Sequence, residues 1–310
     1  MNFTKLQGAG NDFILVEAGE INLDWSQLTV AMCDRHFGIG ADGLLVLLPS
    51  RLADFQMHIF NADGSEAEAC GNGLRCLVKY VIDMGLADTE AQEISVETIA
   101  GIRKARLHYE GKLEGAKPLR NLHLPLSFER EEDKGGEVVR IQVSMGEPKF
   151  GAKDIPVVIE PKEGNLVDIT SMLSCNVSVG GRELLLNFIS MGNPHAIYFW
   201  QHPVSNFPLS QLGPEIERHK MFPSRVNFEV ARIINRQQIE ARVWERGVGE
   251  TLACGSGTCA VAVAAQMLDY IDNKADIKLP GGTLEVEWDR IGEVLLGGPA
   301  EIVFTGEWPG

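Results

Sequence analysis

Two short stretches decide the fold of this chain: Ala69-Cys70-Gly71-Asn72-Gly73 and Ala253-Cys254-Gly255-Ser256-Gly257. Both have the pattern Ala-Cys-Gly-polar-Gly, and each leads directly into an apolar stretch. The two cysteines lie 184 positions apart (254 − 70), and Gly10-Asn11 is repeated as Gly192-Asn193 after 182 positions (192 − 10). The pattern predicts two related halves, each of which supplies one cysteine and one Gly-Asn turn to a shared site.

The segments that follow the two cysteines are predicted to be helices. After Cys70 the apolar residues recur at helical spacing, at positions 74, 77, 78, 81 and 82. After Cys254 the segment 259–268 is apolar nearly all round, which is typical of a helix buried on every side. A third, short helix is expected after Asp24, because Gln27 follows at the spacing of a capping box, and it would run toward Gly38.

Alternating or β-branched segments separated by turn residues predict strands through much of the remaining chain. These strands are expected at 3–7, 13–17, 43–48, 55–60, 138–143, 184–189, 226–233, 239–244, 284–288 and 302–304. The fold class is therefore α+β, with two pseudo-symmetric β-rich domains, each a mostly antiparallel sheet or barrel wrapped around a central helix. We expect one domain at 1–125 plus 299–310 and the other at 126–298, because the segment 110–137 has the least pattern.

The composition is that of a soluble globular protein. The chain has 310 residues, 45% of them hydrophobic, and a formal net charge of −15. This charge argues against a nucleic-acid-binding surface and against docking on an anionic membrane. No apolar run reaches the ~18 residues of a membrane helix, and no secretory signal is visible at the start. The six cysteines are expected to be reduced thiols in the cytoplasm.

Each cysteine of the repeated pattern is expected to occupy the last loop position before its helix. The first N–H groups of a helix have no partner within the helix, and together they carry roughly half a positive charge. The glycines of the pattern leave these groups accessible, so the position can hold a carboxylate. The same partial charge favours the thiolate form of a cysteine over the thiol. Two such cysteines in equivalent positions indicate a catalytic pair.

No metal site and no cofactor are expected. Five residues separate Cys70 from Cys76, and the glycine-rich insert suits a loop better than the usual two- to four-residue zinc spacing. Cys76 and Cys259 should point into the core. The segment 8–13 lacks the third glycine and the following helix of a dinucleotide-binding loop. Two other classes remain alternatives: a thiol redox protein, although no Cys-x-x-Cys is present, and a module that binds a zwitterion without turnover.

The chemistry that fits two matched thiols is inversion at the α-carbon of an amino acid. That C–H group is a very weak acid, and its carbanion is stabilised when two helix N-termini hold the carboxylate. One cysteine enters as thiolate and removes the proton, while the other enters as thiol and delivers a proton to the opposite face. The roles exchange when the reaction reverses, so the two titrations are coupled.

The motifs closely resemble those of the diaminopimelate epimerases, which interconvert LL- and meso-diaminopimelate without pyridoxal phosphate. The matching segments occur in order along the whole chain: GAGNDF at 8–13, NADGS at 61–65, ACGNG at 69–73, MGEP at 145–148, MGNPH at 191–195, VN at 226–227, ERGVGETLACGSG at 245–257 and FTGEW at 304–308. Each segment alone is modest evidence, whereas the set is highly specific.

The resemblance implies both the architecture and the roles of individual residues. It implies an active site in the cleft between the two domains and a cytoplasmic homodimer. The substrate would be diaminopimelate, on the route to lysine and peptidoglycan precursors. Cys70 and Cys254 would be the acid/base pair, and His195 and Glu245 are similar to residues that bias the pKa values of the cysteines. The residues implied to bind substrate are Asn11, Asn61, Gly71, Asn72, Asn193, Asn227, Glu245, Arg246, Gly255 and Ser256.

One departure and one alternative accompany the resemblance. The family often carries glutamine after Gly-x-Gly-x-Asp, whereas Gly43 follows that motif here, so no side-chain contact to substrate is expected at this position. The proline racemase and hydroxyproline epimerase group uses the same two-cysteine chemistry and is the alternative function. Taken singly, the asparagines could serve their turns, Glu245 and Arg246 could form a surface pair, and His195 could be a core histidine.

Overall fold

The structure is a computed structural model that describes residues 1–19, 23–67, 70–87, 92–110, 137–158, 167–169 and 172–309. Contacts within the chain divide it into two units. Unit 1 comprises Met1–Gly8, Asp12–Val143 and Gly298–Gly310, and unit 2 comprises Ala9–Asn11 and Ser144–Gly297. The boundary expected after residue 125 lies outside the described residues, and the contacts place the change of unit between Val143 and Ser144.

Unit 1 is built from strands that surround one central helix. Its elements are β1 (Asn2–Gly8), β2 (Asn11–Glu17), α1 (Trp25–Cys33), β3 (Gly43–Leu48), β4 (Phe55–Asn61), β5 (Glu66–Ala67), α2 (Gly71–Asp83), β6 (Glu93–Thr98), β7 (Gly101–Glu110), β8 (Glu137–Ser144) and β19 (Glu301–Glu307). The strands expected at 3–7, 13–17, 43–48, 55–60, 138–143 and 302–304 are all present, and all but 43–48 have slightly wider bounds.

Unit 2 is likewise built from strands around one central helix. Its elements are β9 (Val167–Ile169), β10 (Met172–Val179), β11 (Arg182–Ser190), β12 (Pro194–Phe199), η1 (Val204–Asn206), α3 (Leu209–Glu217), β13 (Asn227–Asn235), β14 (Gln238–Glu245), β15 (Gly249–Thr251), α4 (Gly255–Met267), β16 (Lys274–Leu279), β17 (Gly282–Glu287) and β18 (Leu295–Gly298). The predicted strands at 184–189, 226–233, 239–244 and 284–288 correspond to β11, β13, β14 and β17.

The two units share one order of strands and helices, which confirms the predicted repeat. In unit 1, β2 runs parallel to β3, β3 antiparallel to β4, and β4 parallel to β6. In unit 2, the pairs β12–β13, β13–β14 and β14–β16 have the same three relations. A short strand then leads into the central helix of each unit: β5 pairs with β4 in unit 1, and β15 pairs with β14 in unit 2. Cys70 and Cys254 therefore occupy equivalent places, each between that short strand and that helix.

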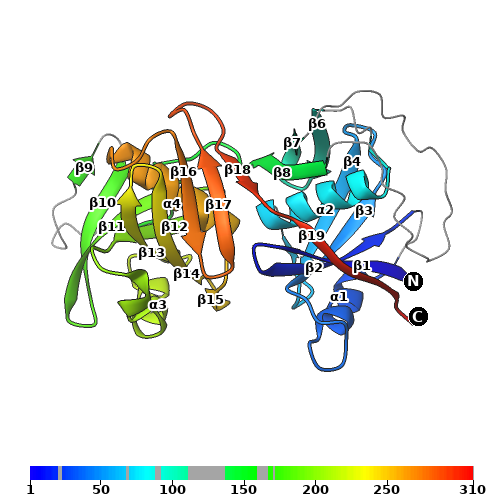
Figure 1. Ribbon diagram of the computed structural model, residues 1–310. Helices are drawn as coiled ribbons and strands as arrows, with labels where there is room; N and C mark the ends of the chain where they lie inside the picture. The colour runs from blue at the N-terminus through cyan, green and yellow to red at the C-terminus, as the bar shows by residue number, and fades with distance from the viewer. Residues whose placement is uncertain are drawn as a thin grey trace. The chain divides into compact units, whose positions relative to one another are not determined.

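Helices α2 and α4 lie at the centres of their respective units (Figure 1). Helix α2 contacts β1, β3, β4 and β19, and its residues 71–78 are all buried. Helix α4 contacts the strands β11 to β14, β16 and β17, and every residue from Gly257 to Gln266 is buried. The apolar segment after Cys254 is thus a helix buried on every side, as its sequence predicts. No helix of the described residues is both long and apolar enough to span a membrane.

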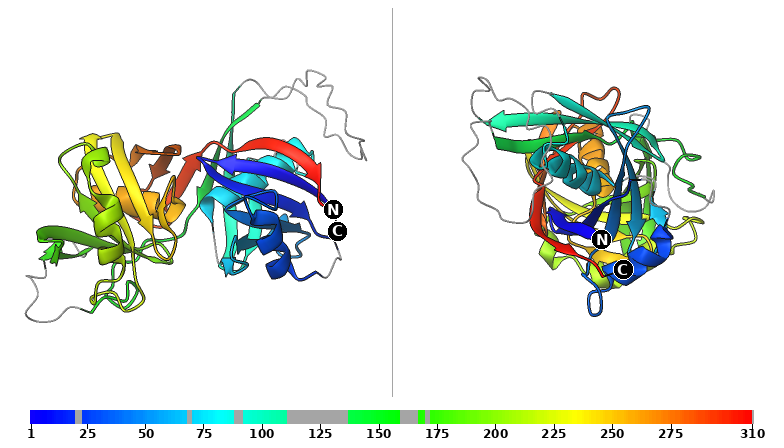
Figure 2. Two further views of the ribbon diagram at one scale, coloured as in Figure 1. Left: turned by 90° about the horizontal axis from the view of Figure 1, so that it is seen from below. Right: turned by 90° about the vertical axis from the view of Figure 1, so that its right-hand side faces the viewer.

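The start and the end of the chain form neighbouring strands of unit 1. Strand β1 pairs antiparallel with β19, and both views in Figure 2 show the two strands side by side. The amino group of Met1 donates to the carbonyl oxygen of Trp308 at 2.8 Å, and the ring of Phe3 packs edge-on against Phe304. The sheet of unit 1 is therefore completed by the last strand of the chain.

Helix α1 begins as expected but ends earlier than expected. The side chain of Asp24 accepts from the N–H of Gln27 at 3.1 Å, which is the predicted N-cap. The expected continuation toward Gly38 is wrong, because the helix ends at Cys33. The Asp34 carboxylate accepts hydrogen bonds from the N–H groups of His36 and Phe37, at 2.7 and 2.8 Å. This turn leads the chain out of the helix.

The core of unit 2 can be tested at Phe188 on β11. This side chain is fully buried, and its ring packs edge-on against Phe222 with centroids 5.6 Å apart. We expect Phe188→Ala to lower the free energy of unfolding of unit 2 by about 3–5 kcal/mol because it leaves a cavity. Leu185→Ala on the same strand, where the side chain is exposed, should change it by less than about 0.5 kcal/mol. Urea unfolding monitored by tryptophan fluorescence compares the two, and equal losses would contradict this core.

Candidate active site

Cys70 is the N-cap residue of α2. Its backbone is extended (φ −144°, ψ 111°), and its carbonyl oxygen accepts from the N–H of Leu74 at 2.8 Å. The Cys70 Sγ atom lies 3.4 Å from the N–H of Gly73 and accepts a hydrogen bond from it. A Cβ atom at Gly73 would lie 3.0 Å from a methyl group of Leu45, so the glycine allows the helix to approach β3 closely. The sulfur therefore faces helix N–H groups, as the sequence pattern predicts.

A buried arginine lies within the first turns of the same helix. Arg75 is fully buried, and its Nη2 donates to Oδ1 of Asn72 at 2.6 Å. Its Nη1 donates to the carbonyl oxygen of Gly71 at 3.5 Å. Both acceptors are residues predicted to hold the reacting carboxylate, and Asn72 is itself only 1% exposed. Arg75 thus orients the carboxamide of Asn72 and brings a positive charge to the turn that Cys70 caps.

Cys254 is the N-cap residue of α4 and is 7% exposed. Its carbonyl oxygen accepts from both the N–H and the hydroxyl group of Thr258, at 2.9 and 2.6 Å. Its Sγ atom lies 3.5 Å from the hydroxyl oxygen of Ser256. A Cβ atom at Gly257 would lie 2.6 Å from Oε1 of Glu229, so a side chain there would displace this carboxylate. The first turn of α4 therefore lies directly against a buried carboxylate.

The surroundings of Cys254 favour the thiol. Burial raises the pKa of Cys254 well above its usual value, and the negative charges of Glu245 and Glu229 raise it further. Burial also raises the pKa of Glu245, although hydrogen bonds from Thr251 (2.5 Å) and Cys254 act in the opposite direction. The expected lowering of the Cys254 pKa is thus wrong, although the N–H of Gly257 in the helix N-terminus does act in that direction. Two carboxylates and the loss of water outweigh the partial charge of one helix.

His195 on β12 joins Glu229 to Asn193. The ring is fully buried, with Nδ1 2.7 Å from Oε1 of Glu229 and Nε2 2.9 Å from Oδ1 of Asn193. An oxygen therefore faces each ring nitrogen, and a ring protonated on both nitrogens donates to both. The second carboxylate oxygen of Glu229 is buried and has no hydrogen-bond partner among the described residues. These contacts connect a predicted binding residue to the charges beside Cys254.

Asn227 holds two segments of backbone together. Its Nδ2 donates to the carbonyl oxygen of Pro194 at 3.1 Å, and its Oδ1 accepts from the N–H of Arg246 at 2.8 Å. Asn227 is 4% exposed, whereas Arg246 is exposed and its Nη1 donates to the carbonyl oxygen of Ser224 at 3.0 Å. These two contacts fix the positions of both the His195 segment and Arg246.

The two Gly-Asn turns have the same backbone conformation. Gly10 and Gly192 have φ values of +80° and +92°, which side chains disfavour, so glycine is required before each asparagine. Asn61, at the end of β4, is exposed, and its Nδ2 donates to the hydroxyl oxygen of Ser65 at 3.0 Å. These positions are compatible with contacts to a ligand and with stabilisation of the turns alike.

Gly43, where the resemblance led us to expect no side-chain contact, lies close to the neighbouring strand. A Cβ atom at Gly43 would lie 2.6 Å from the carbonyl oxygen of Phe60 on the neighbouring strand. Strands β3 and β4 pair at this point, with Gly43 opposite Asn61. A side chain at residue 43 would therefore require the two strands to move apart.

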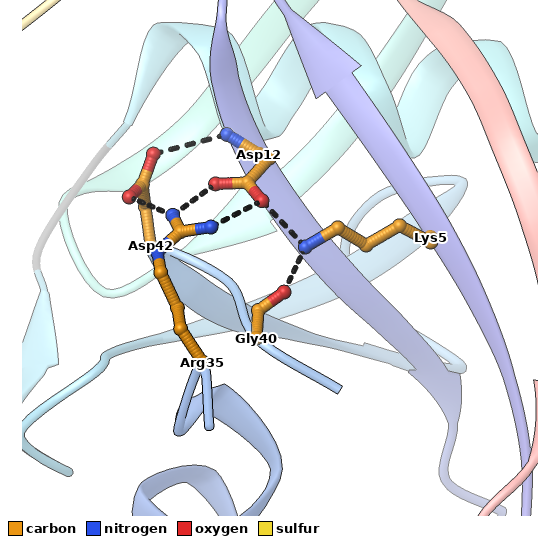
Figure 3. A network of polar contacts seen from close by, with 5 residues as sticks. All are labelled: Lys5, Asp12, Arg35, Gly40 and Asp42. Atoms are coloured by element: carbon orange, nitrogen blue, oxygen red, sulfur yellow. Dashed lines mark hydrogen bonds and ion pairs between the residues drawn. The ribbon is translucent and has the colours of Figure 1, made fainter. Parts of the chain in front are cut away.

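An ionic network ties together the segments that carry Asn11 and Asn61 (Figure 3). The Arg35 guanidinium donates to both carboxylate oxygens of Asp12, at 2.7 and 3.2 Å, and to Oδ1 of Asp42 at 2.7 Å. Lys5 is buried, lies 2.6 Å from Oδ2 of Asp12 and also donates to the carbonyl oxygen of Gly40. The N–H of Asp12 donates to Oδ2 of Asp42 at 3.1 Å. Burial raises the pKa of Asp12, but the hydrogen bonds from Arg35 and Lys5 outweigh it and lower the pKa to about 2.

The backbone of Asp42 extends this network to both asparagine segments. Its N–H donates to the carbonyl oxygen of Asp12 at 2.9 Å, and its carbonyl oxygen accepts from the N–H of Ala62 at 3.2 Å. Asp12 follows Asn11 directly, and Ala62 follows Asn61 directly. The network therefore fixes the two segments relative to each other through charge-assisted hydrogen bonds.

The residues predicted for the site fall into two groups, one in each unit. Unit 1 contains Cys70, Gly71, Asn72 and Asn61, whereas unit 2 contains Cys254, Gly255, Ser256, Asn193, His195, Asn227, Glu245, Arg246 and the Asn11 turn. Sequence reasoning missed Arg75 and Glu229. Both had a signal in the sequence, since Arg75 lies on the apolar face of its helix and Glu229 interrupts an apolar strand. Among the described residues, no group of three or more His, Cys, Asp or Glu is placed to hold a metal ion.

Comparison with known proteins identifies one family over most of the chain. The family model described as diaminopimelate epimerase matches residues 3–117 and 187–303. A diaminopimelate epimerase of Agathobacter rectalis is 44% identical over 310 residues, which cover 99% of both chains. That of Methanococcus maripaludis strain S2 is 40% identical over 311 residues, again with 99% of each chain covered.

Solved structures with the same fold have distant sequences. A phenazine biosynthesis protein of the PhzF family from Bacillus anthracis has a TM-score of 0.63 at 16% identity, covering 100% of this chain and 99% of its own. A probable proline racemase from Agrobacterium radiobacter has a TM-score of 0.64 at 14% identity, covering 99% and 92%. These likenesses show a shared two-domain α+β fold, as predicted.

The ionic network can be tested through the pH dependence of stability. A pKa of Asp12 below its usual 3.8 stabilises the fold above pH 3.8, and this stabilisation is lost as the pH falls through about 2. We expect Arg35→Gln to lower the free energy of unfolding by about 1 kcal/mol at pH 7, with the difference from wild type shrinking between pH 4 and pH 2. Urea unfolding across this range measures it. Arg51→Gln, at an exposed arginine, is the control, and a difference independent of pH would contradict the role of Asp12.

Proposed function

The chain belongs to the diaminopimelate epimerase family of isomerases, and on this premise we propose that Cys70 and Cys254 are the thiolate and thiol that convert LL-2,6-diaminopimelate to the meso isomer. The observation that carries the proposal is the equivalence of the two positions. Each cysteine caps the central helix of its unit, and each cap is followed by a Gly-polar-Gly turn. Two equivalent acid/base groups match a reaction that removes a proton from one face of a carbon and returns one to the other.

In the proposed reaction the electrons and protons balance without a cofactor. The thiolate sulfur takes the α-proton, and the electron pair of the broken C–H bond remains on the α-carbon and its carboxylate. N–H groups of the helix N-termini stabilise this charge, with Gly71, Asn72, Gly255 and Ser256 as the residues concerned. The second thiol then donates its proton to the carbon and becomes the thiolate. Exchange of a proton with solvent, or turnover in the reverse direction, restores the starting state.

Two residues near Cys254 support a role for charge in this step. Glu245 accepts hydrogen bonds from Cys254 and Thr251, so its contacts favour modulation of the cysteine over binding of the substrate ammonium. His195 is linked to Asn193 and, through Glu229, to the first turn of α4. Arg246 is exposed and is proposed to bind the distal carboxylate of the substrate, while the asparagines fix its handedness.

We further propose that the protein is a cytoplasmic homodimer. It would use no cofactor and serve the synthesis of lysine and peptidoglycan precursors. A formal net charge of −15 supports the absence of a nucleic-acid partner. The proline or hydroxyproline epimerase alternative has only a likeness of fold in its favour, at 14% and 13% identity.

Single replacement of either cysteine tests the two-base reaction. We expect Cys70→Ala and Cys254→Ala each to slow epimerisation of diaminopimelate by at least about 10²- to 10⁴-fold, because each removes one acid/base group. The measurement is the loss of the α-proton signal and the change of stereoisomer in deuterated water, followed by NMR. The control substrates are proline and hydroxyproline.

Matched controls are present on the same two helices. Cys76→Ala on α2 and Cys259→Ala on α4 replace fully buried thiols outside the proposed chemistry, and both variants should retain most of the wild-type rate. Wild-type rates in both Cys70→Ala and Cys254→Ala would end the two-base proposal. Turnover of proline without turnover of diaminopimelate would favour the alternative, and binding of diaminopimelate with no exchange would indicate a binding module.

A further inference from the structure

The two proposed catalytic turns are equivalent in backbone but opposite in the charges that lie against them. The turn after Cys70 contains the guanidinium of Arg75, which bonds to Asn72 and Gly71. The turn after Cys254 lies against the carboxylate of Glu229, and Glu245 accepts a hydrogen bond from the cysteine itself. The turn after Cys70 therefore has a cation beside it, whereas the turn after Cys254 has two carboxylates beside it.

Arg75 is held where its charge acts on the cap of α2. Its side chain is fully buried, and its acceptors at 2.6 and 3.5 Å belong to the two residues that directly follow Cys70. An ideal Cβ atom on Gly8, at the end of β1, would lie 3.5 Å from Nη2, so the guanidinium is enclosed between β1 and the first turn of the helix. A buried charge acts on its neighbours through a low effective dielectric, and its influence is stronger than that of a solvated lysine.

Of the two carboxylates beside Cys254, that of Glu229 is buried and that of Glu245 is half-buried. Glu229 has a side-chain exposure of 2%, and one of its oxygens has no hydrogen-bond partner among the described residues. His195 shares the other oxygen at 2.7 Å, so a positive charge on its ring would balance Glu229 and leave that of Glu245 in excess. The first turn of α4 thus lies in a region with net negative charge.

Among the residues that the structure describes, the remaining charged groups on the packed elements do not reverse this difference. Around α2 each other charged side chain has a polar partner or is exposed. The pairs are Lys5–Asp12, Glu301–Gln7, His58–Glu66, Glu17–Tyr80 and Lys79–Asp83, and Glu307 is exposed. Around α4 the pairs are Arg232–Glu240, Arg242–Glu250 and Lys274 with Glu285 and Glu287, while Arg182, Glu183, Asp276 and Lys278 are exposed.

We propose that the resting enzyme carries its negative charge on Cys70 and its exchangeable proton on Cys254, with Arg75 as the positioning residue that favours the Cys70 thiolate. The inference rests on the proposed two-thiol function and specifies which thiol accepts the first proton and which donates one. Cys70 is the base toward the isomer whose α-proton faces it, and the first proton delivered to the carbon comes from Cys254. The opposite isomer first requires transfer of the resting charge from Cys70 to Cys254.

Titration of the thiolate by its ultraviolet absorbance, in the absence of substrate, tests this assignment. Burial raises the pKa of Cys33 and of Cys76 to about 12, so these two thiols do not contribute to the signal near pH 7. We expect Cys254→Ala to retain the thiolate signal of the wild type near pH 7 and Cys70→Ala to lose it. The reverse pattern, or equal signals in the two variants, would overturn the proposal.

Variants of Arg75 test its role separately. In a Cys254→Ala background, Arg75→Met should move the midpoint of the Cys70 titration upward by about 1 to 3 pH units, because the neighbouring charge is lost. Arg75→Lys keeps the charge and should stay near the unsubstituted midpoint. Lys79→Gln, which removes a cation paired with Asp83 on the same helix, should leave the midpoint unchanged. No shift in a folded Arg75→Met variant would overturn the role of the arginine.

A variant beside Cys254 tests the same charge difference independently, also in the case that Arg75→Met does not fold. In a Cys70→Ala background, Glu229→Gln should move the midpoint of the Cys254 titration downward, and an upward shift or none would contradict the charge difference. Failure of this inference is distinguishable from failure of the proposed function. Epimerisation with the resting charge on Cys254 would refute only the assignment, whereas the expected titrations without turnover of diaminopimelate would refute only the function.

Discussion

The close packing of two helix starts is the constraint on which the rest of the structure depends. At the third residue of α2 and of α4 a side chain would press against Leu45 in one unit and displace the carboxylate of Glu229 in the other. Glycine at Gly73 and Gly257 therefore allows the helices to be buried from their first turns. The same bare backbone leaves N–H groups available at each cysteine cap, so the requirement of packing and that of chemistry are met by one pattern.

Burial gives the charges around these caps their importance. Burial of Cys254 is the main cause of its raised pKa, and the negative charges of Glu245 and Glu229 add to it because they are poorly screened there. Arg75 occupies a comparable place beside Cys70. A duplicated backbone can thus provide two different acid/base environments through a few side chains, while the helix starts themselves remain alike.

The sequence predicted the architecture well because the repeated cysteine pattern and the hydrophobic periodicity report directly on the two central helices. It placed both cysteines correctly at helix starts, and Asp24 at a helix cap. It could not predict the raised pKa of Cys254, because Glu229 and Glu245 come near the thiol only through the pairing of β13 with β14. The network of Lys5, Asp12, Arg35 and Asp42 was missed for the same reason, since charged residues far apart in the sequence carry no periodic signal of their contact.

The pairing of β1 with β19 has a consequence for the synthesis of the protein. Unit 1 needs the final strand of the chain to complete its sheet, and the amino group of Met1 bonds to Trp308 near the other end. The residues of unit 2 from Ser144 to Gly297 are all translated before that strand leaves the ribosome. The sheet of unit 1 therefore closes only after all of unit 2 has been synthesised.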